Sequence, residues 1–285
     1  MGKTQVSHAP ANSTRGRPTG DVDPNEHSTG SVSTGRQNQR APRLNEQNPL
    51  EDNTTKSLFV SETFFSRQGE GKLTGTPSFF IRTSGCNLRC WFCDTPYASW
   101  SPSGETQSIG QILEAAHASG AKHVVLTGGE PLLPSAIGDL CDALQQSGFH
   151  LTIETAGTID KPIRCDLLSL SPKLASSTPN PVDHPRWSQL HESRRMPIGV
   201  MKRLIEAAKD YQLKFVVASA EQFDEVETIV SQLCSRPNHV YIMPQGVTTK
   251  EMDDALEWLK PIAESHGYVY CDRMQIRWFG NRRGT

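Results

Sequence analysis

The sequence predicts an α/β fold built on a buried parallel sheet, arranged as a partial (open) βα barrel. Two observations carry this prediction. Short segments that are apolar almost throughout alternate along the chain with amphipathic helical segments, a pattern typical of parallel strands covered on both faces. About six such strand–helix units follow one another, which suits an open or partial barrel. An open doubly wound sheet is the competing arrangement.

The first elements of this pattern are two strands and a helix. The segments "SLFVSETFFS" (57–66) and "SFFIRTSG" (78–85) are rich in Phe, Val and Ile and read as strands. Ser108 and Gln111 have the spacing of a capping box, which predicts that a helix begins there and ends near Gly120. The apolar face of that helix would carry Ile109, Ile112, Leu113 and Ala116.

The remaining elements alternate in the same way. The later strands are predicted in the segments 123–131, 150–157, 167–173, 213–218, 240–246 and 268–273. Helices are predicted at 135–147 and 201–211, after a cap formed by Ser219 and Gln222, and along the apolar face Met252, Ala255, Leu256, Leu259 and Ala263. Because each strand is apolar and each helix amphipathic, the sheet is expected to be buried by the helices.

Five polar turns stand just after predicted strands: "TSGC", "TGGEP", "ETAG", "SPK" and "MPQG". In barrels and doubly wound sheets alike, ligands bind at the carboxyl ends of parallel strands. The order along the chain therefore predicts that these turns form one functional rim.

Composition divides the chain and excludes several classes of function. Residues 1–53 are rich in Ser, Thr, Gly, Pro, Asn and Arg, which predicts a disordered polar tail before a core domain at 54–285. The net charge of −2 shows no excess of basic residues of the kind that nucleic-acid-binding proteins carry. No run of eighteen apolar residues exists to span a membrane, and no secretory signal is visible. We therefore expect a cytoplasmic protein.

Three of the seven cysteines cluster in a C-x3-C-x2-C pattern formed by Cys86, Cys90 and Cys93. In a cytoplasmic protein such a cluster indicates metal ligation. A structural zinc ion needs four closed ligands, whereas three thiolates suit a [4Fe–4S] cluster with one iron left open. The scattered cysteines could complete a zinc site, but we expect them to be small buried hydrophobes; they are Cys141, Cys165, Cys234 and Cys271.

The cysteine pattern, with Phe92 before its last member, resembles the signature of the radical S-adenosylmethionine (SAM) family. "TGGEP" (127–131) is similar to that family's Gly-Gly-Glu-Pro turn. The resemblance implies a [4Fe–4S] cluster whose open iron binds SAM, and a 5′-deoxyadenosyl radical formed from it. In this family Glu130 would accept from the methionyl amino group.

A finer resemblance is to the 7-carboxy-7-deazaguanine synthases and covers about 60–285. It rests on "SRQGEGKLTGTPSFFIRTSGCNLRCWFCDT", "TGGEP", "ETAG", "SPK", "LKFVV" and "WFGNRRGT". It implies a lyase that converts 6-carboxy-5,6,7,8-tetrahydropterin to 7-carboxy-7-deazaguanine with loss of ammonia, in queuosine and 7-deazapurine biosynthesis. It also implies Mg²⁺, a homodimer and an electron donor of the flavodoxin or ferredoxin type.

The resemblance also implies a set of site residues. The cluster ligands would be Cys86, Cys90 and Cys93, and Thr95 would bind Mg²⁺. SAM would meet Phe92, Cys93, Asp94, Gly129, Glu130, Glu154, Ser171, Pro172, Lys173, Met243, Pro244, Gln245 and Gly246. Substrate would meet Arg67, Gln68, Gly69, Glu70, Arg82, Thr127 and Thr285. The chemistry fits a pterin, because Gln68 can donate and accept and the planar fork of Arg82 can clamp a carboxylate.

Other interpretations stay open at this point. The cysteine pattern also occurs in glycyl-radical-enzyme activases, whose substrate is a protein, and the cysteines could belong to a non-enzymatic Fe–S or zinc module. Glu154 could pair with an arginine instead of binding SAM. The Pro-rich segment 176–199 is expected to be a surface loop despite His184, Trp187 and His191.

Overall fold

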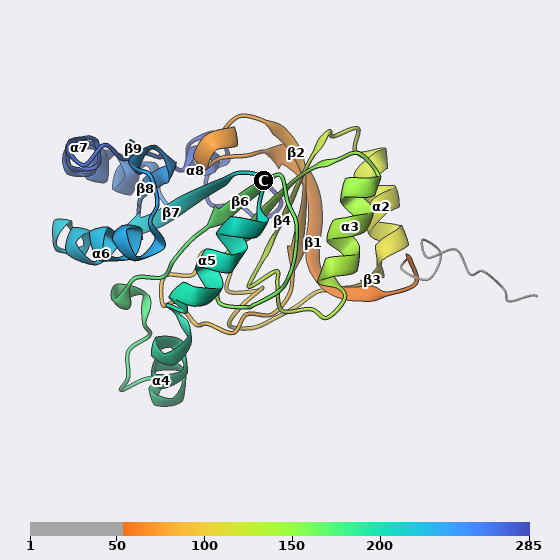
Figure 1. The fold of residues 1–285 in the computed structure, drawn as a ribbon, viewed down its shortest axis with the longest axis horizontal. Helices are drawn as coiled ribbons and strands as arrows, with labels where there is room; N and C mark the ends of the chain where they lie inside the picture. Colours follow the sequence, from red (N-terminus) through yellow and green to blue (C-terminus); the bar gives the residue numbers. More distant parts are fainter. Residues whose placement is uncertain (1–53) are drawn as a thin grey trace, which may run out of the picture. The chain divides into compact units, whose positions relative to one another are not determined.

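The computed structural model describes residues 54–285, and the predicted tail at 1–53 lies outside this part of the chain. Its strands form one sheet in the order β3-β1-β2-β4-β5-β6-β7-β8-β9 (Figure 1). The strands are β1 (Ser57–Arg67), β2 (Pro77–Thr83), β3 (Glu105–Ser108), β4 (His123–Gly128), β5 (His150–Thr155), β6 (Leu167–Leu170), β7 (Tyr211–Val217), β8 (Val240–Pro244) and β9 (Val269–Tyr270). All six later strands predicted from the sequence are present, although β9 has only two residues.

The strand order distinguishes between the open βα barrel and the doubly wound sheet, which the sequence leaves undecided. From β2 through β4 to β9 neighbouring strands are parallel and follow one another in chain order, while β1 pairs antiparallel with β2 and β3. Because βα crossovers are right-handed, an order without reversal brings successive helices to the same face, whereas a doubly wound sheet reverses its order. The sheet is open, with β3 and β9 at its two ends. The predicted open βα barrel is confirmed.

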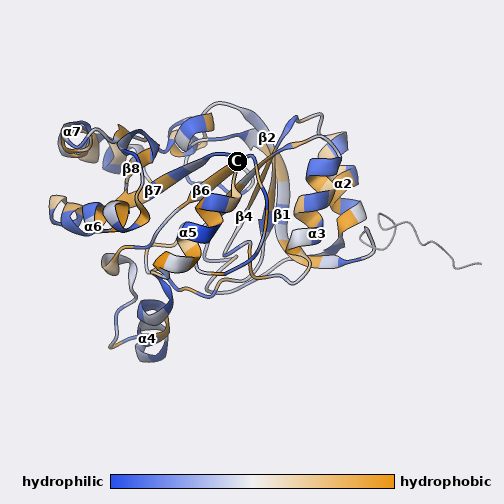
Figure 2. Ribbon diagram, in the orientation of Figure 1, coloured by the Kyte–Doolittle hydropathy of each residue, from blue (hydrophilic) through white to orange (hydrophobic). Residues whose placement is uncertain are grey.

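Helices cover the sheet from one end to the other. They are α2 (Ile109–Ala118), α3 (Ile137–Gln146), α4 (Pro185–Arg194), α5 (Ile198–Ala207), α6 (Phe223–Leu233), α7 (Thr249–Ser265) and α8 (Met274–Phe279), with short 3₁₀ turns at Gly71–Leu73, Ala175–Ser177, Ala220–Gln222 and Pro237–His239. In Figure 1, α2 and α3 flank one end of the sheet and α6 and α7 the other. Figure 2 shows apolar and polar faces along most of these helices, while α4 is mainly hydrophilic.

The core lies between the sheet and its helices. Leu126, Ile153, Phe215 and Ile242, each from a different parallel strand, have no exposed surface. Each such side chain stabilises the fold by about 1.5–3 kcal/mol relative to an exposed position. The apolar strands thus form a rigid base for the turns at their carboxyl ends.

The helix cap predicted for α2 is confirmed, whereas the cap predicted for α6 is wrong. Ser108 and Gln111 form the predicted reciprocal capping box at α2. The cap predicted from Ser219 is wrong: a 3₁₀ turn precedes α6, and the Ser219 side chain makes no cap there. Instead, the Gln222 amide oxygen accepts from the Ala218 backbone at 2.9 Å. Thr248 forms a second capping box, at α7, that the sequence reading missed.

Two further expectations need correction. The segment 176–199 is not simply a surface loop, because it contains α4 with Pro185 at its first turn, and His191 of α4 is fully buried. Among the scattered cysteines, Cys141, Cys165 and Cys271 are buried, but Cys234 is exposed. Cys234 ends α6 in the left-handed conformation, with φ of 54°, and this position at a helix end keeps it at the surface.

Within residues 54–285, no helix has both the length and the apolar character that a membrane span requires.

Candidate active site

A cavity of about 880 Å³ opens at the carboxyl ends of the parallel strands. All five predicted turns contribute to its wall. It is lined by most of the predicted site residues, namely Arg67, Gln68, Gly69, Glu70, Arg82, Cys86, Cys90, Phe92, Cys93, Asp94, Thr95, Thr127, Gly129, Glu154, Ser171, Lys173, Met243, Gln245, Gly246 and Thr285. The predicted SAM contacts that do not line it are Glu130, Pro172 and Pro244.

The three clustered cysteines lie on an irregular loop after β2. All three thiols are free, half-buried and part of the cavity wall. The Cys86 sulfur accepts from the Leu88 backbone at 3.4 Å, and the Cys93 sulfur lies 3.1 Å from the Ser99 hydroxyl. Burial raises the pKa of the Cys86 thiol to about 12 and that of Cys90 to about 11. Coordination to a metal would remove these protons.

The donor set fits an Fe–S cluster better than a single ion. Among residues 54–285, no three His, Cys, Asp or Glu side chains converge closely enough to hold one metal ion. A [4Fe–4S] cube takes each thiolate on a different iron, so its ligands do not have to converge on one point. Three cysteines facing one cavity, which would bind as soft thiolates, match that requirement.

The "TGGEP" turn packs directly against the cysteine loop. Gly129 donates to the Thr83 carbonyl at 3.2 Å and Glu130 to the Gly85 carbonyl at 2.9 Å. A Cβ atom at Gly129 would collide with the backbone of Gly85 and Ala98, so only glycine permits this approach. The glycines therefore set the spacing between the turn and the cysteine loop.

The Glu130 side chain faces into the turn. Its carboxylate accepts from the Leu132 backbone at 3.1 Å, the Thr155 hydroxyl at 2.6 Å and the Ala156 backbone at 3.0 Å. The residue has no exposed surface, and this burial raises the pKa of the carboxyl above its ordinary value. Glu130 thus ties the β4 turn to the β5 turn, and its contact with SAM stays a prediction.

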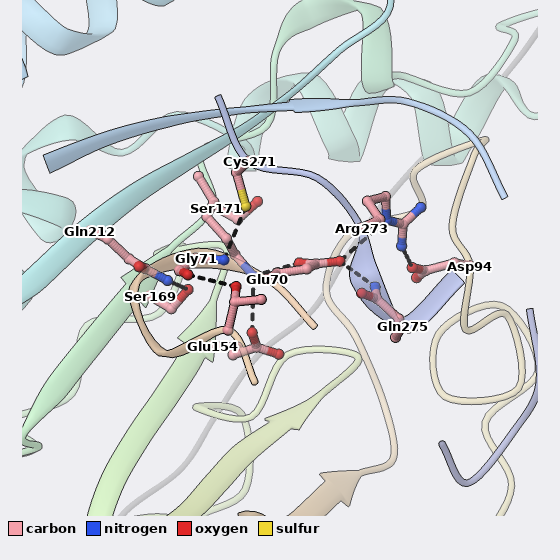
Figure 3. A network of polar contacts seen from close by, with 12 residues as sticks. Glu70, Gly71, Asp94, Glu154, Ser169, Ser171, Gln212, Cys271, Arg273 and Gln275 are labelled. Carbon is pink, nitrogen blue, oxygen red and sulfur yellow. Dashed lines mark hydrogen bonds and ion pairs between the residues drawn. The ribbon is translucent and has the colours of Figure 1, made fainter. Parts of the chain in front are cut away.

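Glu70 lies at the centre of a buried ionic network (Figure 3). Lys214 Nζ contacts Glu70 at 2.7 Å and Glu154 at 2.9 Å. On the other side, Arg273 Nε contacts Glu70 at 3.2 Å, and Arg273 also pairs with Asp94. Each cation therefore joins Glu70, a predicted substrate contact, to a carboxylate predicted to meet SAM.

Burial and charge oppose each other in this network. Burial by itself would raise the pKa of Glu70, but the charges of Lys214 and Arg273 outweigh it and hold that pKa below its ordinary range. Burial would likewise lower the pKa of Lys214, whereas Glu154 and Glu70 raise it above its ordinary value. The groups therefore stay charged at neutral pH, and each depends on its partners.

A second ionic cluster holds Arg82 at the cavity wall. Arg82 Nε and the Tyr97 hydroxyl both donate to the same oxygen of Glu62 at 2.8 Å. Arg283 donates to the other Glu62 oxygen at 3.0 Å, and its guanidinium lies 4.3 Å from the centre of the Tyr97 ring. Glu62 thus connects Arg82 to the C-terminal segment, which brings Thr285 to the cavity.

These geometries agree with the comparisons to known proteins. The Radical SAM superfamily profile matches residues 80–217, a span that includes the cysteine loop and "TGGEP". The 7-carboxy-7-deazaguanine synthase of Rhodopirellula baltica is 61% identical over 229 residues, covering 80% of this chain and 89% of that protein. The synthase of Halobacterium salinarum is 43% identical, covering 77% and 90%. This chain belongs to the 7-carboxy-7-deazaguanine synthase family.

A solved structure supports the fold of this synthase family member. The crystal structure of QueE from Escherichia coli superposes with a TM-score of 0.59 at 22% identity, and covers 80% of this chain and 100% of that chain. At that identity the likeness concerns the fold alone. The fold is therefore the open α/β arrangement of the radical SAM type.

Sequence reasoning missed several cavity residues of this synthase. Lys214 and Arg273 line the cavity, as does Gln275, which donates to Glu70 at 2.6 Å. One signal was available, because Lys214 interrupts the otherwise apolar run "LKFVVA" and a lysine in a buried strand needs an ionic partner. Glu154 does have a structural partner, but it is Lys214 and not an arginine.

Proposed function

We propose that this protein converts 6-carboxy-5,6,7,8-tetrahydropterin to 7-carboxy-7-deazaguanine with loss of ammonia, a step toward queuosine and other 7-deazapurines. The observation that carries the proposal is that three cysteines, Arg82 and the Glu70 network line one cavity in a chain 61% identical to a protein named for this activity. The cofactors are a [4Fe–4S] cluster, SAM and Mg²⁺. When bound, the cluster and SAM supply the 5′-deoxyadenosyl radical that takes a hydrogen from ring carbon 6 of the substrate.

The residues of the chain supply ligation, orientation and exclusion of water. Cys86, Cys90 and Cys93 would hold the cluster, and the aromatic ring of Phe92 at the cavity wall would limit access of water to it. Residues of the neighbouring turns would hold SAM. We assign its contacts to Phe92, Cys93, Asp94, Gly129, Glu130, Glu154, Ser171, Pro172, Lys173, Met243, Pro244, Gln245 and Gly246, of which all but Glu130, Pro172 and Pro244 line the cavity.

The substrate lies between the Glu70 network and Arg82. Glu70, held charged by Lys214 and Arg273, accepts from the N–H groups at the pyrimidine edge of the pterin. Arg82 binds the substrate carboxylate through its guanidinium, whose Nε is already oriented by Glu62. Further contacts come from Arg67, Gln68, Gly69, Thr127 and Thr285. Buried charges with fixed partners need little reorganisation when the substrate binds.

Thr95 supplies one oxygen to Mg²⁺. The residue lines the cavity just after the last cluster cysteine, and its hydroxyl lies 3.8 Å from the Cys93 sulfur. Mg²⁺ keeps several waters and takes few protein oxygens, so a single hydroxyl suffices beside the substrate carboxylate. Thr95 and Arg82 line the same cavity, so Mg²⁺ held at Thr95 would help to orient the substrate carboxylate.

Further features of the proposal concern the environment of the enzyme. It acts in the cytoplasm as a homodimer, and a flavodoxin- or ferredoxin-type protein reduces its cluster. Residues 54–285 form its catalytic core domain.

The direct test is an anaerobic assay of the reconstituted protein with SAM, dithionite, Mg²⁺ and carboxytetrahydropterin. We expect carboxydeazaguanine by mass spectrometry, in many turnovers per SAM, because the hydrogen is returned to the cofactor. Deoxyadenosine released in proportion to time without any deazapurine would contradict the proposal and favour an activase that acts on a protein. A protein that binds zinc and no iron would instead indicate a non-enzymatic zinc module, and one that binds a cluster but does not cleave SAM would indicate a non-enzymatic Fe–S module.

Replacing Thr95 with Ala should raise the Mg²⁺ concentration needed for half-maximal activity by about tenfold, equivalent to about 1.4 kcal/mol for one lost oxygen ligand. Cluster absorbance and SAM binding should stay at wild-type levels. Thr95→Ser keeps the hydroxyl and is the matched control, which we expect to behave like wild type. Parallel loss of cluster, SAM binding and Mg²⁺ response in Thr95→Ala would show misfolding and refute the assignment to Mg²⁺.

A further inference from the structure

The segment Ala175–Arg195, here called the clasp segment, lies against the cysteine loop. It comprises a 3₁₀ turn and α4, in the stretch where the sequence predicted a surface loop. The Trp91 backbone donates to the Ser177 carbonyl at 3.2 Å, and the Trp91 indole donates to the Ser176 carbonyl at 2.7 Å. At the other end of the loop, Arg194 donates to the Asn87 carbonyl at 3.2 Å. The clasp segment therefore contacts the loop on both sides of Cys90.

His191 makes the central contact of the clasp segment. Its Nδ1 accepts from the Arg89 backbone N–H at 3.2 Å, and its Nε2 lies 2.8 Å from the Ser177 hydroxyl. Ser177 in turn donates to the Leu174 carbonyl at 2.7 Å. Because Nδ1 accepts, Nε2 carries the proton and donates to Ser177. His191 and Ser177 have no exposed surface, so the imidazole is held at both nitrogens away from water.

The Arg89 side chain reinforces this contact. Its guanidinium lies 4.0 Å from the centre of the Trp187 ring, in the clasp segment, and donates to the Cys86 and Leu88 carbonyls at 2.7 Å each. Arg89 is only 8% exposed. The buried Arg89 guanidinium therefore hydrogen-bonds to the loop between Cys86 and Cys90 and also stacks on the clasp segment.

Cys90 lies between the two backbone N–H groups that the clasp segment binds, those of Arg89 and Trp91. The loop has no helix or strand of its own, so these N–H groups have no partner in regular secondary structure. We propose that the clasp segment positions the Cys90 thiolate for the [4Fe–4S] cluster, with His191 as its positioning residue. This inference rests on the cluster assigned under the proposed function.

Two substitutions at His191 separate the two nitrogens. In His191→Asn the amide oxygen occupies the place of Nδ1 and can still accept from the Arg89 N–H. In His191→Gln the amide extends to the place of Nε2, which keeps the contact with Ser177 and removes the acceptor for Arg89. If His191 acts by positioning the loop, Gln should fail where Asn succeeds, although Gln fills more of the buried volume.

The readouts are iron and sulfide content after reconstitution, and the EPR spectrum of the reduced cluster with and without SAM. Loss of a hydrogen bond that orients a metal ligand typically costs about 10- to 100-fold in metal affinity or activity, and we expect that range for His191→Gln together with an altered EPR spectrum. His191→Asn should keep the wild-type spectrum and the change that SAM induces. His117→Asn, the same substitution at an exposed helix position, serves as the control, and far-UV circular dichroism confirms folding of each variant.

Outcomes of this experiment separate the inference from the proposed function. A wild-type protein without a cluster would refute the cluster assignment itself. A wild-type cluster together with unchanged EPR spectra in both His191 variants would overturn the positioning role. Equal loss in His191→Asn and His191→Gln, with folding intact, would also overturn it, because the acceptor at Nδ1 would then make no difference.

Discussion

Replacing Lys214 with Met is expected to lower the free energy of unfolding by about 3 kcal/mol, because it leaves buried carboxylates without their shared cation. Lys214 has a side chain only 6% exposed and contacts both Glu70 and Glu154. The same change should reduce kcat/KM by about 100-fold, since a displacement of about 1 Å in a positioned group can cost that much. Urea unfolding and the deazaguanine assay measure the two effects.

A second variant and a control make the Lys214 result interpretable. The double variant Lys214→Met with Glu70→Gln removes the charge that Lys214 neutralises, so it should regain part of the stability while activity stays low. Lys209→Met is the matched control, because Lys209 pairs with Asp166 at the surface with a side chain 71% exposed. We expect it to change stability by less than about 1 kcal/mol. Wild-type stability and activity in Lys214→Met would contradict the bridging role.

Replacing Cys90 with Ala should abolish the absorbance at about 400 nm that thiolate-ligated Fe–S clusters show. Formation of carboxydeazaguanine should be lost with it. The reason is that the three thiolates of the loop would be the cluster's protein ligands, so a loop with only two of them should not retain it. Iron content and the visible spectrum after anaerobic reconstitution measure the effect, and circular dichroism shows whether the apoprotein is folded.

Cys141→Ala is the control for the Cys90 variant, because Cys141 is buried in α3 and does not line the cavity. It should keep the absorbance band and the iron content of the wild type. A Cys90→Ala protein that retains the band at wild-type intensity would refute the ligand assignment. Loss of the band in both variants would show that reconstitution responds to core packing and not to ligation.

Local sequence patterns were sufficient for much of the fold and site. The apolar strands and amphipathic helices appear where periodicity predicts them, because burial acts on each segment in the same way. The turns after the strands line one cavity, since parallel strands bring their carboxyl ends to one edge. The cysteine spacing needed no tertiary information, as all three predicted ligands lie within eight consecutive residues, 86–93.

Other features depend on contacts between distant segments. Glu70 and Arg273 are 203 positions apart, and Glu70 and Lys214 are 144 apart. No local pattern couples such residues, although a lysine in an apolar strand showed that some partner was required. The inward direction of Glu130 was equally invisible, because its partners Thr155 and Ala156 belong to the next strand and its turn.

The sequence by itself determined the α/β fold class with a buried parallel sheet, the spacing of the three clustered cysteines and the polar turns after the strands, because these follow from spacing and periodicity within short stretches. The tertiary structure alone decided the chain-ordered sheet, the bridging of Glu70 to Glu154 and Asp94 by Lys214 and Arg273, and the contact of His191 with the cysteine loop. Those features arise from ion pairs and hydrogen bonds that form only when folding excludes water from the site.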